Sequence, residues 1–280
     1  MFILKAVLSI IPHREVIVPP FTSKVSRTVV YKLLEKLGEQ PYPSLHRERE
    51  ARKPLILTPI FHGTKPLIKL DKQQSQMLTI KPGQQYHFTA TAVGVEMTTK
   101  LTSEIINSAN ETIELYEAPV TIAIHEVKAK SFNEIGLREA DAYKITFKTP
   151  TLLQAPKIIK TDQTVRHVLF PSPKLITWSL AMHWNKYAPE HLKIPDIAKL
   201  ATYSDYCLVE VDYRLKPTTA IYDERKRPRG FIGWTLYKWK PKGKKQYEQT
   251  LLKLLDYANY IGIGRSRSIG FGVVSIRETQ

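Results

Sequence analysis

A glycine-rich stretch near the C-terminus, Ile261 to Gly272, constrains the fold of this chain more than any other segment. Its sequence is IGIGRSRSIGFG, in which four glycines surround two arginines and two serines: Gly262, Gly264, Gly270, Gly272, Arg265, Ser266, Arg267 and Ser268. Glycine adopts backbone angles that other residues avoid, so the stretch predicts a tight loop that presents cations and hydroxyls. We expect this loop to hold a phosphate chain. The alternative is a turn that only lets a strand and a helix pack closely.

The elements that flank this loop argue against a mononucleotide site. Apolar residues recur at helical spacing over 244–260, and 271–276 has a strand pattern. Glycine loops that bind mononucleotides precede a helix and use its positive N-terminus, whereas this loop follows a helix and depends on its own arginines for positive potential. A dinucleotide fingerprint would need glycine where Arg267 stands, and the Gly-Lys-Ser/Thr ending of a P-loop is missing.

The charge balance favours a polyanionic partner. The 280 residues include 42 Lys and Arg against 26 Asp and Glu, a formal net charge of +16. This excess suits RNA, DNA or an anionic membrane better than a small neutral substrate. The apolar run 1–12 is too short to span a bilayer, so we expect a buried strand and no membrane attachment. The single cysteine, Cys207, leaves no intramolecular disulfide or cysteine-based zinc site and is typical of a cytoplasmic protein.

The first half of the chain predicts the element order β-α-β-β-α-β. Strand patterns and helical periodicity alternate in this order: strand 2–11, helix 22–37, strand 55–61, strand 85–92, helix 97–108 and strand 112–127, with a short hairpin strand at 66–70 and an interruption at Pro119. This is the order of the ferredoxin-like split unit. The alternative is an irregular α+β domain.

The second half predicts the same order again. Its expected elements are strand 142–148, helix 173–187, a shorter helix near 195–203, strands 206–214 and 230–239, helix 244–260 and the final strand. We therefore expect an α+β protein of two tandem ferredoxin-like domains (RRM-like, βαββαβ), 1–130 and 131–280, with the glycine-rich loop at the C-terminal end. No direct sequence repeat links the halves, so the duplication rests on element order.

Basic residues gather at two other places in the sequence. Lys24, Arg27 and Tyr31 share the polar side of helix 22–37, and the connection that follows carries His46, Arg52 and Lys53. Arg225, Lys226, Arg227 and Arg229 lie between the two strands of the second hairpin. A solvated face is the ordinary explanation for such a charge run, and a bound anion is the functional one.

Aromatic residues follow the second basic cluster. The run Arg229-Gly230-Phe231 begins like the sheet motif of RNA-recognition domains, but Ile232 and Gly233 then break that pattern. Trp234, Tyr237 and Trp239 could stack on bases, although aromatic residues at strand spacing more often belong to a core.

These features together resemble a known family. The terminal GIGRSRSIGFG, the strand end Phe147-Lys148-Thr149-Pro150-Thr151 and the doubled element order resemble the CRISPR repeat-processing endoribonucleases of the RAMP superfamily, over nearly the whole chain. Three features are most similar to the archaeal branch: the helix start Ser23-Lys24, the Arg-Gly ending at Gly230 and the Gly-Arg-Ser-Arg loop. The resemblance implies cleavage of CRISPR precursor RNA within each repeat, with no metal ion or other cofactor. The 2′-hydroxyl attacks the adjacent phosphate and leaves a 2′,3′-cyclic phosphate and a 5′-hydroxyl guide RNA.

The resemblance also implies catalytic residues. Many family members use a histidine after the first helix with a tyrosine and a lysine, which His46, Tyr31 and Lys53 match here. The archaeal branch lacks this histidine and relies on basic residues that match Lys24, Arg27, Lys53 and Arg229. A histidine can supply about 10²–10⁴-fold general acid–base catalysis, whereas an arginine stays charged and only positions and stabilises. Without His46 the mechanism is electrostatic, and Lys24 or Lys53 moves the proton.

The expected partner is single-stranded or weakly structured CRISPR repeat RNA. We expect RNA contacts from the glycine-rich loop and from Arg52, Arg225 and Arg227. The resemblance leaves room for a homodimer and for hand-over of the guide RNA to an interference complex, neither of which any stretch demonstrates. Two alternatives stay open: a non-catalytic RAMP subunit that binds guide RNA in such a complex, and a general single-stranded RNA-binding module.

Overall fold

The protein forms two compact units in this computed structural model, which describes residues 1–36, 52–71, 77–107, 110–155 and 167–279. The first unit comprises Met1–Ser131 and two short segments from later in the chain, Ala220–Arg227 and Ser268–Gly270. The second unit comprises Phe132–Thr219, Pro228–Arg267 and Phe271–Gln280. The connection of the second hairpin and part of the glycine-rich stretch therefore belong to the first unit.

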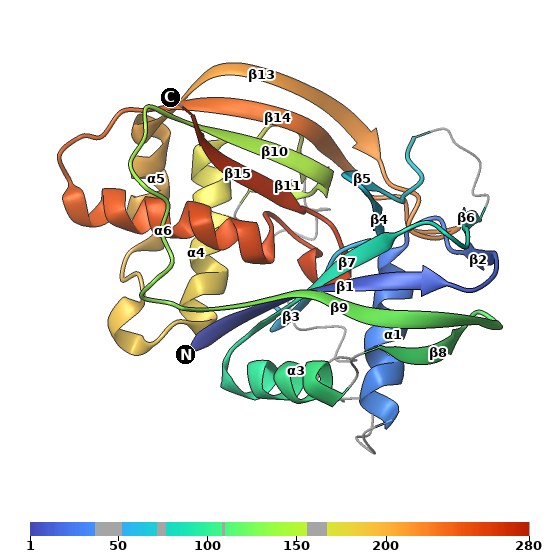
Figure 1. The fold of residues 1–280 in the computed structure, drawn as a ribbon. Helices are drawn as coiled ribbons and strands as arrows, with labels where there is room; N and C mark the ends of the chain where they lie inside the picture. Colours follow the sequence, from blue (N-terminus) through green and yellow to red (C-terminus); the bar gives the residue numbers. More distant parts are fainter. Residues whose placement is uncertain (37–51, 72–76, 108–109, 156–166, 280) are drawn as a thin grey trace. The chain divides into compact units, whose positions relative to one another are not determined.

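A large antiparallel sheet forms the framework of the first unit (Figure 1). Its strand order is β5-β4-β7-β1-β9-β8, with β3 also paired to β7, and β2 and β6 form a separate pair. The strands of this unit are β1 (Phe2–Pro12), β2 (Val16–Val18), β3 (Leu55–Leu57), β4 (Phe61–His62), β5 (Lys65–Pro66), β6 (Leu78–Ile80), β7 (Tyr86–Val93), β8 (Glu111–Leu115) and β9 (Ala118–Ser131). The strands predicted over 2–11 and 85–92 are confirmed as β1 and β7.

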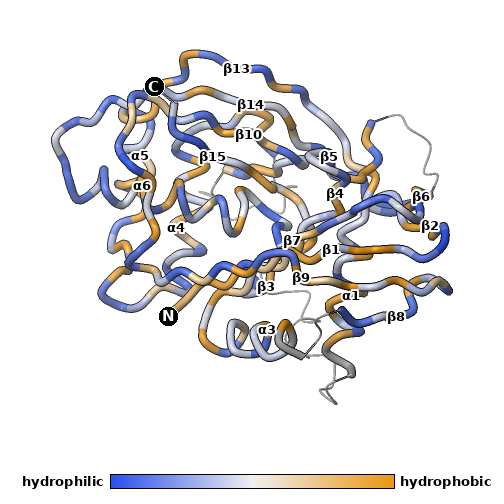
Figure 2. The backbone as a smooth tube through the Cα atoms, viewed as in Figure 1, coloured by the Kyte–Doolittle hydropathy of each residue, from blue (hydrophilic) through white to orange (hydrophobic). Residues whose placement is uncertain are grey.

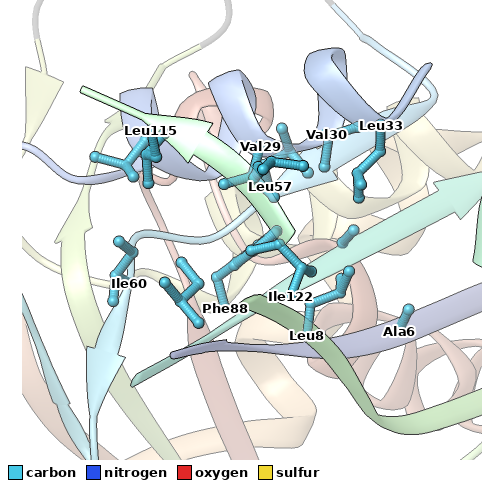
Figure 3. Packing of buried hydrophobic residues seen from close by; sticks show 14 of the residues in the cluster. Ala6, Leu8, Val29, Val30, Leu33, Leu57, Ile60, Phe88, Leu115 and Ile122 are labelled. Carbon is cyan, nitrogen blue, oxygen red and sulfur yellow. The ribbon is translucent and has the colours of Figure 1, made fainter. Parts of the chain in front are cut away.

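Two helices, α1 (Ser23–Lys36) and α3 (Val95–Asn107), cover one face of this sheet. Every second residue of β1 points to them and is buried: Leu4, Ala6, Leu8 and Ile10. Figure 3 shows Val29, Val30 and Leu33 of α1 packed over Leu8, Phe88 and Ile122 of the sheet. Each fully buried aliphatic side chain stabilises the fold by about 1.5–3 kcal/mol, so this layer fixes which side of α1 faces outward.

Two strand predictions in this unit are wrong in detail. The strand expected over 112–127 is a hairpin of β8 and β9, because Tyr116 and Glu117 both have positive φ, 48° and 63°, and form its two-residue turn. Consecutive left-handed residues match the twist of hairpin strands, but Asn-Gly is their usual sequence, so nothing in the sequence marked this turn. The strand expected over 55–61 divides into β3 and β4 around Pro59, which lacks the N–H of a ladder bond.

A four-stranded antiparallel sheet with the order β13-β14-β10-β15 forms the framework of the second unit. Helices α4, α5 and α6 lie on one side of this sheet (Figure 1). The main elements are β10 (Ala142–Thr151), α4 (Pro173–Tyr187), α5 (Ile197–Cys207), β13 (Leu208–Thr219), β14 (Arg229–Trp239), α6 (Lys245–Ile261) and β15 (Val274–Thr279), with a small pair of β11 (Leu153–Gln154) and β12 (His167–Val168) and short 3₁₀ turns η1 (Glu190–Leu192) and η2 (Arg267–Ile269). The predicted order of strands and helices is confirmed in this unit.

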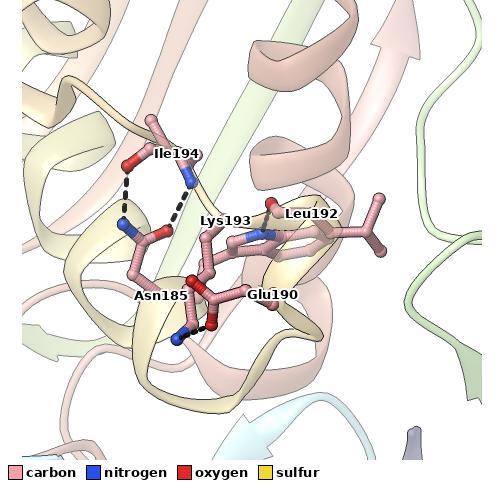
Figure 4. Close-up of polar contacts among 6 residues, drawn as sticks. Asn185, Glu190, Leu192, Lys193 and Ile194 are labelled. Atoms are coloured by element: carbon pink, nitrogen blue, oxygen red, sulfur yellow. Dashed lines mark hydrogen bonds and ion pairs between the residues drawn. The ribbon is translucent and has the colours of Figure 1, made fainter.

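Aromatic rings and an asparagine hold the helices of the second unit together. Phe132, Trp184 and Tyr257 are almost fully buried and pack edge to face or tilted. The Asn185 amide donates to the Ile194 carbonyl at 2.7 Å and accepts from the Ile194 N–H at 2.8 Å, which secures the connection between α4 and α5 (Figure 4). Cys207, at the end of α5, has no exposed surface.

Both units are therefore α+β, and the ferredoxin-like assignment of each half stays a prediction. Hydrophobic residues run along much of β1 in the first unit, whereas hydrophilic residues recur along β13 in the second unit (Figure 2). Among the helices in the described ranges, none is long and apolar enough to cross a membrane.

Candidate functional site

A small hollow in the first unit brings together residues that are distant in sequence. Arg27 and Tyr31 of α1 line it with Lys53, and the remaining lining residues are Leu55, Leu57, Ser268 and Ile269. Arg27 is exposed, and Tyr31 and Lys53 are partly buried. The structure therefore places two of the expected catalytic cations and the expected tyrosine at one hollow, which the Ser268–Gly270 segment of the glycine-rich stretch helps to form.

Packing of α1 explains this placement. Val25, Val29 and Leu33 are at most 4% exposed and face the sheet, so the residues midway between them, on the opposite side of the helix, face outward. Arg27 and Tyr31 are such residues. Lys53 reaches the hollow because β3, which begins two residues later, is buried and pairs with β7.

Lys24 has two partners that the sequence reasoning missed. Its Nζ lies 4.0 Å from Oδ2 of Asp223 and 4.7 Å from the centre of the Tyr222 ring. Both partners belong to the Ala220–Arg227 segment of the first unit. An ion pair and a cation–π contact together hold the ammonium against this segment, beside the face of α1 that carries Arg27.

Asp223 also shapes its own turn. Its Oδ1 accepts the backbone N–H groups of Lys226 at 2.6 Å and Arg225 at 3.0 Å. These hydrogen bonds, first that of Lys226, and the positive charge of Lys24 hold the pKa of the carboxyl below its usual value. Arg225 and Arg227 are exposed on this turn. An aspartate before a basic run is an ordinary turn signal, so the turn was detectable in the sequence, whereas the pairing with Lys24 was not.

Three phenols lie within the electrostatic reach of Arg27. Burial raises the pKa of Tyr31, Tyr116 and Tyr222, and the positive charge of Arg27 opposes each rise. At neutral pH these groups are therefore protonated and can donate hydrogen bonds. An anion held by Arg27 would meet neutral O–H donors beside the guanidinium.

The Ser268–Gly270 segment packs directly on the start of α1. The Ser23 hydroxyl donates a hydrogen bond of 2.7 Å to the carbonyl of Ile269. Gly270 has a φ of +87°, and a Cβ there would lie 2.8 Å from Pro59 Cδ and from Ser23 Cβ. Only glycine fits this position without displacing a neighbour.

The other three glycines serve close backbone contacts in the second unit. A Cβ would lie 2.5 Å from the Gly272 carbonyl oxygen at Gly262, 2.6 Å from the Leu152 carbonyl oxygen at Gly264 and 1.8 Å from the Ile263 carbonyl oxygen at Gly272. Backbone hydrogen bonds form at the same places. The N–H of Arg265 donates to the Leu152 carbonyl, and the N–H of Gly272 donates to the Pro150 carbonyl. The alternative reading, close packing of strand and helix, gives the physical reason for these three glycines.

The two arginines of the glycine-rich stretch have different surroundings. Arg265 is exposed, and its guanidinium donates to the side chain of Gln154. Arg267 is only 8% exposed, and its Nη1 donates to the Gly262 carbonyl at 3.4 Å. Its charge also opposes the rise that burial causes in the pKa of Tyr257. The expectation that Arg267 faces RNA therefore needs correction, because this side chain supports the loop from inside. Ser266, at the exposed tip, has a positive φ of 59°.

The remaining predicted residues are distributed as follows. Arg229 is exposed at the start of β14 in the second unit, where it pairs with Thr219. Arg52 is partly buried next to Lys53 in the first unit. His46 lies in 37–51, outside the described residues. Of the aromatic residues, Tyr237 and Trp239 are buried and cannot stack on a base, whereas Trp234 is partly exposed.

Comparisons with known proteins agree on one family. The profile of the Cas6 N-terminal domain matches residues 4–130, and the profile of the CRISPR-associated endoribonuclease Cas6 matches residues 145–274. Two curated archaeal relatives from Saccharolobus solfataricus, the CRISPR-associated endoribonucleases Cas6 1 and Cas6 2, are each 24% identical and align over 98% of this chain and 96% of their own length.

Solved structures show the same fold. A Cas6 product complex has a TM-score of 0.70 at 17% identity, covering 98% of this chain and 99% of that one. Thermus thermophilus Cas6 has a TM-score of 0.67 at 16% identity, covering 98% of both chains. A RAMP protein described as binding different RNA substrates has a TM-score of 0.55 at 11% identity and covers 98% of this chain and 100% of its own. Since the two Cas6 profiles together match most of its length, the chain belongs to the CRISPR-associated endoribonuclease Cas6 family.

Proposed function

We propose that this protein cleaves CRISPR precursor RNA within each repeat by a metal-independent reaction, in which the 2′-hydroxyl attacks the adjacent phosphate. The products are a 2′,3′-cyclic phosphate and a 5′-hydroxyl guide RNA. The observation that carries the proposal is the shared hollow of Arg27, Tyr31 and Lys53, with Lys24 on the same helix.

The reaction has three physical needs. A base removes the 2′-hydroxyl proton, cations stabilise the charge that builds on the pentavalent phosphate, and an acid protonates the departing 5′-oxygen. Arg27 suits the second role, because its guanidinium stays charged and can form two parallel hydrogen bonds to phosphate. Lys24 and Lys53 are the described groups of the cationic set that can exchange a proton.

Tyr31 adds a neutral donor to this set. Burial raises the pKa of its phenol, so the O–H is retained at neutral pH and can donate to a phosphate oxygen. The energetic benefit is larger in a partly dehydrated hollow than in open water, because the local dielectric constant is lower.

RNA binding draws on further exposed cations in this proposal. Arg225 and Arg227 extend the positive surface of the first unit, and Arg265 contributes from the second. Arg229, at the start of β14, stays with Lys24, Arg27 and Lys53 in the proposed catalytic set. The RAMP protein described as binding different RNA substrates supports RNA as the ligand, since its fold matches this chain. We include hand-over of the guide RNA to an interference complex, and homodimer formation, in the same proposal.

The experiment that tests the function is a cleavage assay in EDTA. The purified protein is incubated with a panel of CRISPR repeat RNAs, and a scrambled RNA of equal length is the control. Cleavage of a repeat RNA with a product that ends in a 2′,3′-cyclic phosphate supports the proposal. A matched substrate with a 2′-deoxy nucleotide at the cleaved bond must stay intact, because it lacks the nucleophile.

Three outcomes would contradict the proposal. Binding of repeat RNA without cleavage would favour the non-catalytic RAMP subunit, and equal affinity for repeat and scrambled RNA would favour the general RNA-binding module. A cut in the deoxy substrate would show that the attacking group is not the 2′-hydroxyl.

A further inference from the structure

The sheet of the second unit carries a hollow on the face opposite its helices. Its volume is about 450 Å³, within the range of about 300–1,000 Å³ for small-molecule sites. The lining residues are Thr146, Phe147, Lys148, Arg214, Leu215, Lys216, Ile232, Gly233 and Trp234. All of them belong to the second unit, and none is part of the hollow around Arg27.

An irregularity in strand pairing opens the sheet at this place. β10 and β14 are in register from Ala142 to Phe147, and pairing resumes only at Thr151 opposite Phe231. Gly233 lies at this irregularity with a φ of +121°, and a Cβ there would lie 2.0 Å from the Arg214 carbonyl oxygen. Glycine at this position therefore allows the close approach of the β13 backbone, which a side chain would prevent.

The strand register gathers positive charge around this opening. Trp234 pairs with Arg214 on one side and Thr146 on the other, and Ile232 pairs with Lys216. Arg214 and Lys216 are exposed, and Lys148 lines the hollow with them. On the outer strand β15, Arg277 pairs with Lys144. β13 also carries acidic residues near these cations in the sequence, Glu210 opposite Tyr237 and Asp212 opposite Leu236.

Trp234 supplies an apolar surface in the middle of these cations. It is partly exposed, in contrast to the buried Tyr237 and Trp239 of the same strand. The Lys144 ammonium lies 4.1 Å from the centre of its ring. A flat base that replaced this ammonium on the ring would free it to contact the phosphate of the same nucleotide.

The cations around the hollow repel one another when no anion is bound. Partial burial, and then the positive charge of Arg277, lower the pKa of Lys148. An anion bound in the hollow would reduce that repulsion, so the charges of the site complement a phosphate group.

We propose that this hollow binds a nucleotide of single-stranded RNA, with its base on Trp234 and its phosphates on Arg214 and Lys216. The site lies wholly in the second unit and includes none of the residues assigned to cleavage. This proposal rests on the proposed function only in taking RNA as the partner. It does not depend on the cleavage reaction.

Tryptophan fluorescence tests the proposal with a probe that cannot be cleaved. A short 2′-O-methyl oligouridylate is titrated into the full-length protein at low and physiological salt. A base stacked on Trp234 quenches its emission, so we expect saturable quenching that the Trp234→Leu variant loses. Trp178→Phe is the matched control, because Trp178 is also partly exposed but lies on α4. Quenching that persists in Trp234→Leu and disappears in Trp178→Phe would overturn the proposal.

Charge reversal tests the phosphate contacts independently of the tryptophan. The double variant Arg214→Glu with Lys216→Glu should lower the affinity for the probe at least tenfold, whereas Lys199→Glu with Lys245→Glu, the same charge change on α5 and α6, should lower it much less. Equal losses of affinity in the two double variants would show that the probe is held by the overall positive charge, and would contradict a specific site. Thermal melts confirm that each variant is folded, and heparin, a polyanion without bases, should bind without quenching Trp234.

Cleavage measurements keep this proposal distinct from the proposed function. Trp234→Leu should weaken the binding of repeat RNA while leaving the single-turnover rate at saturating protein within about twofold of the original. If the protein cut no RNA, the probe titration would still decide whether the hollow binds nucleotides. A large drop in the saturated rate would place Trp234 in the cleavage machinery and contradict a separate site.

Discussion

The Ser23 hydroxyl donates a 2.7 Å hydrogen bond to the carbonyl of Ile269, a residue 246 positions later in the chain. This bond fixes the Ser268–Gly270 segment against the first turn of α1, where Lys24 and Arg27 begin the cationic face. The glycine-rich stretch therefore contributes to the first unit through its backbone and packing. Of its two arginines, only Arg265 presents its charge to solvent, since Arg267 is buried.

Replacing Gly270 with alanine should destabilise this arrangement. Gly270 has a φ of +87° and would place a Cβ 2.8 Å from Ser23 and Pro59, whereas Gly243 has a similar φ of +81° with open space around it. Gly243→Ala should cost about 1–2 kcal/mol from backbone strain alone. Gly270→Ala should cost about 1–3 kcal/mol more, because it adds a steric clash, and should also slow cleavage. Urea unfolding measures both, and equal costs would mean that the segment does not pack on α1.

The two arginines of the glycine-rich stretch should separate stability from binding. Arg267→Ala removes a buried cation that bonds to a carbonyl, so we expect a loss of about 1.5–3 kcal/mol in the free energy of unfolding. Arg265→Ala removes an exposed side chain and should change stability by less than about 0.5 kcal/mol while lowering RNA affinity. Thermal melts and RNA titrations distinguish the two, and the reverse pattern would contradict the burial of Arg267.

Stability should depend on pH through Asp223. Its pKa is lower in the folded protein than the value of about 3.9 for an exposed aspartate, so the folded state favours the ionised carboxylate. The resulting stabilisation is complete above that value and is lost as the pH falls through the folded pKa. Asp223→Asn should therefore be less stable than the original protein at neutral pH, with a difference that shrinks below about pH 4. A difference in unfolding free energy that stays constant into acid would contradict the folded state's preference for the carboxylate, which rests first on the Lys226 N–H and then on the Arg225 N–H and Lys24.

Cys207 should be unreactive in the native protein. It has no exposed surface, and burial raises the pKa of its thiol, so the nucleophilic thiolate is scarce at mildly alkaline pH. Reaction with a disulfide reagent should be slow in buffer and complete in denaturant. Rapid native reaction would show that the junction of α5 and β13 opens readily.

Local periodicity explains which parts of the fold were predictable. The helices α1, α4 and α6 and the strands β1, β7 and β14 follow apolar patterns that depend on neighbouring residues alone. The turn at Tyr116 and Glu117 was missed because left-handed angles there are imposed by strand pairing and carry no glycine signal. The return of Ala220–Arg227 and Ser268–Gly270 to the first unit depends on contacts between distant residues, which a single sequence does not reveal.

In the candidate site, too, local features were predictable and contacts between distant residues were not. Arg27 and Tyr31 share a helix face by spacing alone, so their proximity was predictable. The pairing of Lys24 with Asp223 and the burial of Arg267 arise from residues far apart in the chain. The sequence of the glycine-rich stretch does not indicate which of its two arginines points to solvent and which points into the loop.

The most direct measurement is the single-turnover cleavage rate of repeat RNA at saturating protein. We compare Lys24→Ala, Arg27→Ala, Lys53→Ala and Arg229→Ala with Lys32→Ala, a control cation on α1 that does not line the hollow. Loss of one group that stabilises the transition state typically costs about 10²–10³-fold, so the test variants should slow cleavage by at least about tenfold while binding changes less. The control should keep its rate. Unchanged rates in all four test variants would contradict the proposed active site.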